Sequence, residues 1–250
     1  MADKIRWGIL GCGRIARTFA ESLQHVPDAK LAAVASKTPG RAAEFAKIFN
    51  AERYYEDYQE LVKDESLDVI YVATTHNFHY EHALLCLENK KAVLCEKPFT
   101  VNSKQAEDLI KVARRNKVFL MEAMWTRFLP CIVELNRLLS QNIIGDIGFL
   151  RADFGNSTKG RDVPKYYFDP NLAGGALLDL GVYPVSFARL VFKKSPVGIK
   201  TFGYIADSKV DVHAAYMFEF GFGKVAMLSS SYSVDMPHDA VICGTEGYIK

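Results

Sequence analysis

Short apolar runs alternate with longer helical patterns over the first half of the chain. The apolar runs are predicted to be strands at Ile5–Leu10, Lys30–Ala35, Val69–Ala73, Ala92–Cys95 and Val118–Met121. The segments between them have helical patterns at Ile15–His25, Arg41–Phe49, Tyr80–Asn89 and Ser103–Arg115. Strand–helix alternation of this kind folds into a parallel sheet with helices on both faces. The first half is therefore predicted to be a doubly wound α/β domain.

The pattern changes near residue 123, where a helix at about Leu129–Gln141 is expected before a strand at Phe149–Phe154. A polar loop, Gly155–Pro170, and a helix follow. Later strand-like runs lie at Val197–Ile205, Val212–Phe220, Lys224–Tyr232 and Ala240–Cys243. Glycine-containing turns join them, which favours an antiparallel sheet. We therefore predict two domains, 1–123 and 124–250, the second being α+β with a large, mostly antiparallel open sheet.

The end of the chain, Gly244–Lys250, is typical of a turn that opens another strand. We therefore expect a further C-terminal segment, which could carry site residues of its own.

Composition excludes several classes of protein. The net charge is +2 with no basic block, so a nucleic-acid partner is not expected. No apolar run approaches the ~20 residues of a membrane span, and no signal peptide precedes the first strand, so a cytoplasmic protein without a membrane partner is expected. The five cysteines are an odd number and widely spaced, and most lie in apolar patterns. They indicate reduced core residues rather than a disulfide framework or zinc site.

A glycine-rich turn joins the first predicted strand to the first helix. Gly11 and Gly13, with Ala16 three residues later, fit the dinucleotide-binding fingerprint of a Rossmann domain in its alanine form. Gly11 permits the tight turn, Gly13 admits a pyrophosphate, and Ala16 allows close helix–strand packing. Arg14 and Ile15 begin the helix whose N-terminus would hold the phosphates. Enzymes that use S-adenosylmethionine carry similar turns, but the strand–turn–helix context favours a dinucleotide.

The end of the second predicted strand indicates which nicotinamide cofactor is used. An NAD enzyme usually places an acidic residue there to hold the ribose 2′-hydroxyl. This chain instead offers Ser36, Lys37, Thr38 and Arg41, which suit a 2′-phosphate. NADP(H) is therefore favoured, with NAD(H) as the alternative. Lys37 and Arg41 could also be solvated surface charges.

Glu96, Lys97 and Pro98 follow the apolar run Ala92–Cys95. In an open parallel sheet the ligand crevice lies outside the carboxyl ends of the strands. Lys97 is therefore predicted to stand over a bound cofactor, where a lysine can transfer a proton.

The segment from Gly174 to Pro184 holds a second pair of ionisable residues. Asp179 and Tyr183 are four residues apart, so on a helix they share a face. A tyrosine near the lysine cation would be a better base near neutral pH, because the cation favours the phenolate. The alternative is an Asp at a helix N-terminus and a tyrosine of the core.

Three histidines follow the third of these predicted strands, at positions 76, 79 and 82. Imidazole is a common metal ligand. No cysteine or acid completes a zinc pattern, so we predict no metal site.

Taken together, three segments resemble the glucose–fructose oxidoreductase / inositol dehydrogenase (Gfo/Idh/MocA) family of NAD(P)-dependent oxidoreductases. They are Gly11–Ala16, Glu96–Pro98 and Gly174–Tyr183. The resemblance covers essentially the whole chain. Most of that family has a histidine where this chain has Tyr183. The tyrosine form, together with Leu120–Phe128, is similar to the dimeric dihydrodiol dehydrogenase branch, which also oxidises D-xylose with NADP.

The resemblance implies roles for individual residues. Lys97 would be an acid/base residue with a cis Lys97–Pro98 bond, and Tyr183 would replace the histidine as proton donor or acceptor. Asp179 would orient the substrate hydroxyl or Lys97. A homodimer through the C-terminal sheet is also implied.

Other residues are implied to form the walls of the site. Trp125 and Phe128 would make an apolar wall beside nicotinamide and substrate, and Glu96 would lie near the nicotinamide ribose. Arg127 would contact cofactor or substrate, or else form a structural ion pair. The cofactor pocket would be lined by Thr74, Thr75, His76 and Asn77, with His79 at the start of a helix.

The predicted reaction is reversible hydride transfer between NADP(H) and a carbon that bears a secondary hydroxyl. The expected substrate is a pyranose sugar, at its anomeric carbon, or a cyclic trans-diol. The alternatives are another sugar or polyol dehydrogenase, a non-catalytic nucleotide-binding regulator of the same fold, and a Rossmann methyltransferase.

Overall fold

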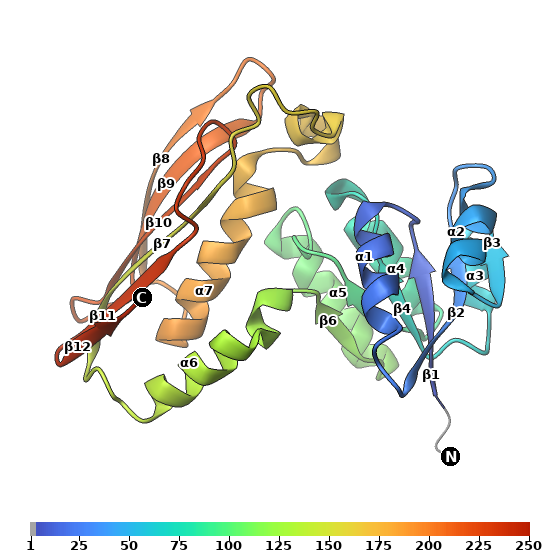
Figure 1. Ribbon diagram of the computed structural model, residues 1–250, viewed down its shortest axis with the longest axis horizontal. Helices are drawn as coiled ribbons and strands as arrows, with labels where there is room; N and C mark the ends of the chain where they lie inside the picture. The colour runs from blue at the N-terminus through green and yellow to red at the C-terminus, as the bar shows by residue number, and fades with distance from the viewer. Residues whose placement is uncertain (1–3) are drawn as a thin grey trace. The chain divides into compact units, whose positions relative to one another are not determined.

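The structure, a computed structural model, describes residues 4–250. The chain divides into two compact units between Ala123 and Met124 (Figure 1).

The first unit contains a parallel sheet of six strands in the order β3-β2-β1-β4-β5-β6. The strands are β1 (Ile5–Leu10), β2 (Ala29–Ala35), β3 (Arg53–Tyr55), β4 (Val69–Val72), β5 (Ala92–Cys95) and β6 (Leu120–Glu122). The helices are α1 (Arg14–Leu23), α2 (Arg41–Phe49), α3 (Tyr58–Lys63), α4 (His79–Glu88) and α5 (Ser103–Asn116).

Two apolar cores show that helices cover both faces of this sheet. On one face α1 and α2 bury residues such as Ala16 and Phe45. On the other face α3, α4 and α5 bury residues such as Leu61, Leu87 and Leu109. This arrangement confirms the predicted doubly wound α/β fold (Figure 1).

The register of the sheet aligns the ends of its strands. Leu10 pairs with Ala35 on one side and with Val72 on the other, and Val72 pairs with Cys95. Cys95 in turn pairs with Glu122. The residues that follow these strand ends therefore begin at one level along a single edge of the sheet.

Three elements of this unit were not predicted: β3, α3 and the 3₁₀ turn η1 (His76–Phe78). β3 is a three-residue edge strand whose Arg53 and Tyr54 are exposed, so it lacks the apolar pattern of the buried strands. α3 has six residues, too few for a clear helical period. Its start is fixed by Asp57, which accepts a hydrogen bond from the Gln59 amide at 2.8 Å.

The second unit contains a six-stranded sheet in the order β12-β11-β7-β10-β9-β8. The strands are β7 (Ile147–Gly155), β8 (Gly198–Ile205), β9 (Asp211–Glu219), β10 (Val225–Ser231), β11 (Ala240–Gly244) and β12 (Gly247–Ile249). The central pair β7–β10 is parallel and every other pair is antiparallel. The mostly antiparallel sheet is thus confirmed, and its one parallel pair joins strands that are far apart in sequence.

The helical elements of the second unit leave one sheet face open. They are η2 (Trp125–Phe128), α6 (Pro130–Ser140), η3 (Lys165–Phe168), η4 (Pro170–Leu172), a π-helical turn η5 (Leu177–Gly181) and α7 (Val182–Phe192). α7 buries Ala188 and Val191 in one core with Leu150, Tyr216 and Leu228 of the sheet.

One stretch of the second unit has the length and hydropathy of a membrane span, although no such run was expected from the sequence. Pro170–Phe192 has the length and mean hydropathy, 1.4, of a helix that could cross a membrane. The sequence prediction overlooked it because polar residues such as Asn171 and Asp179 interrupt the apolar run. This is weak evidence for a span, because a core helix passes the same test. Part of the stretch is α7, which is packed on the sheet.

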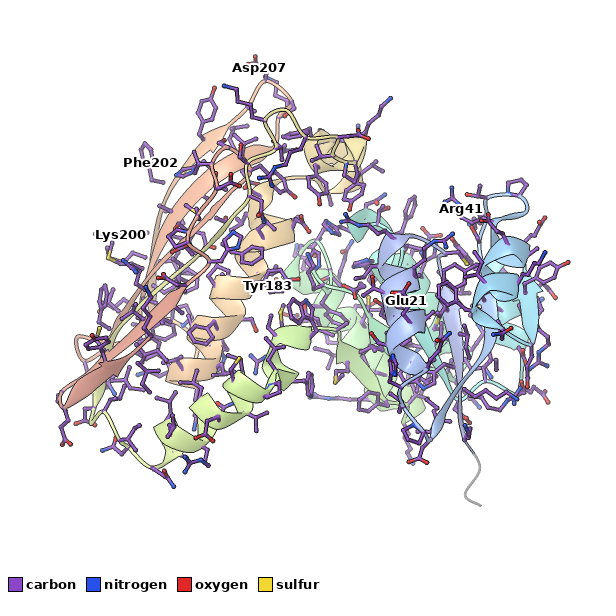
Figure 2. All side chains as sticks on the ribbon, in the orientation of Figure 1. Glu21, Arg41, Tyr183, Lys200, Phe202 and Asp207 are labelled. Atoms are coloured by element: carbon purple, nitrogen blue, oxygen red, sulfur yellow. The ribbon has the colours of Figure 1, made fainter. Side chains whose placement is uncertain are left out.

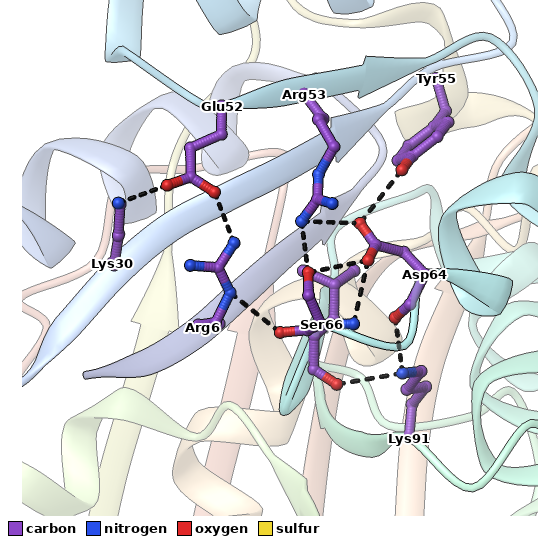
Figure 3. A network of polar contacts seen from close by, with 9 residues as sticks. Arg6, Lys30, Glu52, Arg53, Tyr55, Asp64, Ser66 and Lys91 are labelled. Atoms are coloured by element: carbon purple, nitrogen blue, oxygen red, sulfur yellow. Dashed lines mark hydrogen bonds and ion pairs between the residues drawn. The ribbon is translucent and has the colours of Figure 1, made fainter. Parts of the chain in front are cut away.

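A polar network lies in the first unit at the amino ends of its strands, opposite the edge where the carboxyl ends are aligned (Figure 3). The buried Asp64 carboxylate accepts hydrogen bonds from the Ser66 amide (3.0 Å) and hydroxyl (2.8 Å), and from Tyr55 (3.1 Å). It also pairs with Arg53, at 3.1 Å. Burial acts to raise the pKa of Asp64, but the hydrogen bonds outweigh it and the pKa lies below its ordinary value.

We expect Asp64→Asn to lower the free energy of unfolding by about 1–3 kcal/mol near pH 7, because it removes a buried, hydrogen-bonded charge. The pKa of Asp64 is depressed in the folded state. The stabilisation is therefore complete above the unfolded pKa of ~4 and is lost as the pH falls through the folded pKa. Urea denaturation at several pH values measures this. Exposed Asp28→Asn is the matched control; equal stability of the two variants at pH 7 would contradict the assignment.

Candidate active site

The turn after β1 fits the close approach of a ligand. Gly11 has φ +98°, and a Cβ there would lie 2.9 Å from the Thr74 methyl group and 3.1 Å from the Ala73 backbone. Only glycine avoids both the strained backbone and the clash. The Gly11 amide donates to the Ala35 carbonyl at 2.9 Å, which fixes the turn against β2.

The start of α1 has the properties of an anion site. Gly13 is the N-cap residue and provides no side-chain cap, and the first helical turn contains no acidic residue. Its amide groups are therefore available to a ligand. Arg14 and Ile15 are exposed, whereas Ala16 is fully buried against the sheet. These features fit a dinucleotide pyrophosphate.

Cys12, inside the glycine turn, is a buried free cysteine. Its thiol lies 3.4 Å from the Ala35 carbonyl, and burial raises the pKa of Cys12 to about 12. The thiol therefore stays protonated. Cys86 and Cys95 are buried as predicted, but Cys131 is exposed, so the prediction of core cysteines is wrong for Cys131.

The end of β2 carries two cations. Lys37 and Arg41 are exposed, and within residues 4–250 neither is part of an ion pair. The Lys37 ammonium lies 5.2 Å from the ring centre of Tyr58. Ser36 is buried, and its hydroxyl accepts a hydrogen bond from the Thr38 amide at 3.3 Å. One carboxylate was missed by sequence reasoning, because Glu56 lies after β3; it accepts from the Gly40 amide at 3.0 Å.

His79 joins the loops that follow β4 and β5. It is fully buried, with Nδ1 2.7 Å from the Pro98 carbonyl and Nε2 3.0 Å from the Thr74 carbonyl. Burial lowers the pKa of His79. The His79 ring therefore links the loop after β4 to the loop after β5.

The other residues of the β4 loop bond mainly within the first unit. The Thr75 hydroxyl donates to Asn77 at 2.9 Å. His82 lies 3.0 Å from the Thr74 hydroxyl, and burial lowers the pKa of His82 to about 4. His76 is buried with its ring 5.8 Å from that of His79. Throughout residues 4–250, no group of three or more His, Cys, Asp or Glu side chains could hold a metal ion.

Glu96 and Lys97 begin the loop after β5. Glu96 is buried and its carboxylate accepts hydrogen bonds from the Tyr71 hydroxyl and, at 3.1 Å, from the Lys97 amide. Burial raises the pKa of Glu96. The Lys97–Pro98 bond is cis, as the resemblance implied. Glu122, which was not predicted, accepts from the Phe99 amide at 3.0 Å and holds the far side of this loop.

Tyr183 lies in the first turn of α7 among aromatic side chains. Its oxygen accepts a hydrogen bond from the Trp125 indole at 3.0 Å. This bond occupies a lone pair of the oxygen and not its proton. Phe154 on β7 lies 5.0 Å away, ring centre to ring centre, and His238 stacks on Phe154 at 4.6 Å. Phe154 and His238 were missed because no local motif contains them.

Asp179 does not lie on α7 as the four-residue spacing suggested. It sits in the π-helical turn that precedes α7, with 8% of its surface exposed. Its carboxylate accepts a hydrogen bond from the Tyr232 hydroxyl at 2.7 Å. The extra residue in a π turn changes the angular spacing, so a shared α-helical face does not describe the pair.

The remaining predicted residues lie on η2. Trp125 and Phe128 are 53% and 64% exposed. Arg127 donates to the Ser186 hydroxyl at 3.3 Å and carbonyl at 3.4 Å. Among the described residues it takes part in no ion pair, so the alternative of a structural salt bridge is not supported.

Comparison with known families agrees with this geometry. Residues 5–124 match the oxidoreductase family with an NAD-binding Rossmann fold, and residues 132–250 match the Gfo/Idh/MocA C-terminal domain. The chain belongs to the Gfo/Idh/MocA oxidoreductase family. Membership confirms the resemblance and the prediction of a dehydrogenase that acts on CH–OH groups.

Relatives of known activity extend over nearly the whole chain. It is 42% identical to trans-1,2-dihydrobenzene-1,2-diol dehydrogenase of Xenopus laevis, over 98% of this chain and 74% of that protein. Identity to the Homo sapiens enzyme of the same name is 36%, with the same two coverages. The chain thus spans about three quarters of these relatives.

Solved structures give the same fold. An aldose-aldose oxidoreductase from Caulobacter crescentus, complexed with glycerol, has a TM-score of 0.90 and 25% identity over 98% of this chain and 76% of that one. The 3-ketoreductase KijD10 from Actinomadura kijaniata, in complex with NADP and TDP-benzene, has a TM-score of 0.85 and 29% identity. That match covers 97% of this chain and 74% of the other.

Proposed function

We propose that this protein is an NADP(H)-dependent dehydrogenase that oxidises one secondary alcohol of a cyclic trans-diol or a pyranose sugar. The observation that carries the proposal is Tyr183, whose oxygen is held by the Trp125 indole beside the ring of Phe154. A phenol oxygen fixed in this way suits proton exchange with a bound alcohol. The flat aromatic side chains around it suit a ring-shaped substrate.

The reaction breaks the C–H bond of the alcohol carbon and the O–H bond of its hydroxyl. When bound, the oxidised nicotinamide supplies the hydride acceptor, so the hydrogen leaves the carbon with both electrons of the C–H bond. The O–H proton passes to Tyr183 or Lys97, and the carbon becomes a carbonyl. Asp179, held by Tyr232, orients the reacting hydroxyl. Gly11, Gly13 and the amides of α1 would hold the pyrophosphate, and Trp125 and Phe128 would cover the substrate.

The cofactor preference rests on Lys37 and Arg41, two exposed cations at the end of β2. A 2′-phosphate would accept charge-assisted hydrogen bonds from both. Glu56, which binds the Gly40 amide, is the carboxylate that would oppose a phosphate there. The NADP-bound 3-ketoreductase among the structural relatives supports the same preference. NADP(H) is therefore the cofactor that we propose, in preference to NAD(H).

The open face of the second sheet supports a homodimer. Phe202 and Tyr204 on β8 are 83% and 63% exposed, and the strand registers place them on the same face as Met217 and Met227. Figure 2 shows Phe202 and Lys200 pointing outward from the sheet. An apolar face of this kind is typical of a protein–protein interface. We propose that a second copy of the chain covers it.

The catalytic proposal predicts that purified protein reduces NADP with a cyclic trans-diol or D-xylose, followed by NADPH absorbance. Lys97→Ala and Tyr183→Phe are each expected to lower kcat by about 10²–10⁴-fold, because each removes a proton-transfer group. Exposed Lys104→Ala is the control. Wild-type protein that binds NADPH but turns over no diol or sugar would overturn the proposal and favour the non-catalytic regulator.

The cofactor proposal predicts that Lys37→Ala with Arg41→Ala reduces kcat/KM for NADP by at least about tenfold and changes it little for NAD. Loss of charged hydrogen bonds to the 2′-phosphate is the physical reason. Lys47→Ala, an exposed cation elsewhere on α2, is the control. An equal loss of kcat/KM with both cofactors would show that the two cations do not bind the 2′-phosphate.

The dimer proposal predicts that wild-type protein sediments as a dimer at micromolar concentration. Phe202→Asp with Met217→Lys is expected to give monomers, because it places charges in the apolar contact. Tyr54→Asp, an exposed aromatic of the first unit, is the control. Analytical ultracentrifugation measures the state, and a wild-type monomer would contradict the proposal.

A further inference from the structure

Tyr232, the residue after β10, connects Asp179 to a distant part of the second unit. Only 2% of its surface is exposed, and its hydroxyl donates to Asp179 Oδ2 at 2.7 Å. Burial raises the pKa of Tyr232, so its hydroxyl keeps its proton and acts as a donor to the carboxylate. No local motif predicts this contact, because the two residues are 53 positions apart.

The ring of Tyr232 packs on the polar loop before the π turn. It stacks on Tyr167 of η3, with ring centres 4.9 Å apart and planes 10° apart, and it meets Phe168 edge-on at 5.9 Å. Its carbonyl accepts hydrogen bonds from the amide and hydroxyl of Thr158, at 2.9 and 3.1 Å. Tyr232 therefore contacts both the beginning and the end of the loop 155–170.

The same loop is seated against the residues that lead into the π turn. The Gly175 amide donates to the Tyr167 carbonyl at 2.9 Å. A Cβ on Gly174 would lie 2.5 Å from the Tyr166 carbonyl and 2.6 Å from that of Tyr167, so glycine is required for this contact. Beyond it, Asp211 accepts from the Leu177 amide at 2.7 Å and anchors the turn. Loop, turn and Tyr232 thus pack as one assembly.

We propose that Tyr232 is a positioning residue, which holds the Asp179 carboxylate in one orientation. That orientation then depends on the loop 155–170. This inference rests on the proposed function, in which Asp179 orients the reacting hydroxyl. A carboxylate in a π turn has rotamers to choose from, and a charge-assisted hydrogen bond from a rigid ring selects one. The stack on Tyr167 fixes the Tyr232 ring, so the loop determines where the Tyr232 hydroxyl lies.

Tyr232→Phe removes the hydroxyl and keeps the ring. We expect kcat for the diol or sugar to fall about 10–100-fold, the size of a lost hydrogen bond to a charge, while KM for NADP stays within twofold. Tyr216→Phe is the matched control, because this buried tyrosine donates to the Gly181 carbonyl of the same turn and not to Asp179. Its kcat is expected to stay within threefold of wild type.

A double-mutant cycle separates positioning from general loss of structure. Adding Tyr232→Phe to Asp179→Asn is expected to lower kcat by less than a further threefold, because the Tyr232 hydroxyl acts through the Asp179 carboxylate. Tyr167→Ala, which keeps the hydroxyl and removes the stack, is expected to lower kcat in the same direction. Independent, multiplicative losses would overturn the inference, and so would wild-type kcat in Tyr232→Phe.

Failure of the inference can be told apart from failure of the proposed function. Wild-type protein without turnover would reject the function and the inference together. Wild-type turnover that Tyr232→Phe matches would reject the inference alone. Chemical denaturation of each variant supplies a readout besides activity. The same cycle measured as free energies of unfolding should show a coupling between Tyr232 and Asp179, and its absence would contradict the contact itself.

Discussion

The alignment of strand ends in the parallel sheet is the constraint on which the cofactor half of this protein depends. Register brings Leu10, Ala35, Val72 and Cys95 level with one another. The chain must leave the sheet after each of them along the same edge. The glycine turn, the two cations, the β4 loop and Glu96–Pro98 are therefore neighbours by topology, although nearly 90 residues separate the first from the last. The backbone of the sheet assembles these groups before any side chain contributes.

Desolvation explains why so many polar groups at that edge are bonded to protein. A buried polar group without a partner costs stability, so most buried polar groups have one; Ser208 and Ser230 are exceptions among the described residues. His79 meets two carbonyls, and Glu96 accepts from Tyr71 and from the Lys97 amide. Asp179 meets Tyr232 in the second unit. These partners hold side chains in one orientation, which is also what a catalytic site requires.

Elements with strong local patterns could be predicted from the sequence. β1, β5 and α2 have the predicted bounds, because each is apolar at the right period and is limited by glycine or proline nearby. Exposed β3 and short α3 were missed because β3 lacks the apolar pattern of a buried strand and α3 is too short to show a helical period. The parallel pairing of β7 with β10 was also missed. Turn residues report only the pairing of consecutive strands, and these two are not consecutive.

The two halves of the site differ in how much of them the sequence reveals, and the reason is physical. A pyrophosphate is bound mainly by backbone amides, which a continuous strand–turn–helix segment supplies, so a local motif is sufficient. A substrate is selected by side chains that only the tertiary structure brings together. In the function that we propose, Tyr183 from α7, Phe154 from β7 and Tyr232 after β10 are such side chains. The cofactor class can therefore be predicted from a few residues in a row. The contact between Asp179 and Tyr232 instead joins residues 53 positions apart, which no local motif contains.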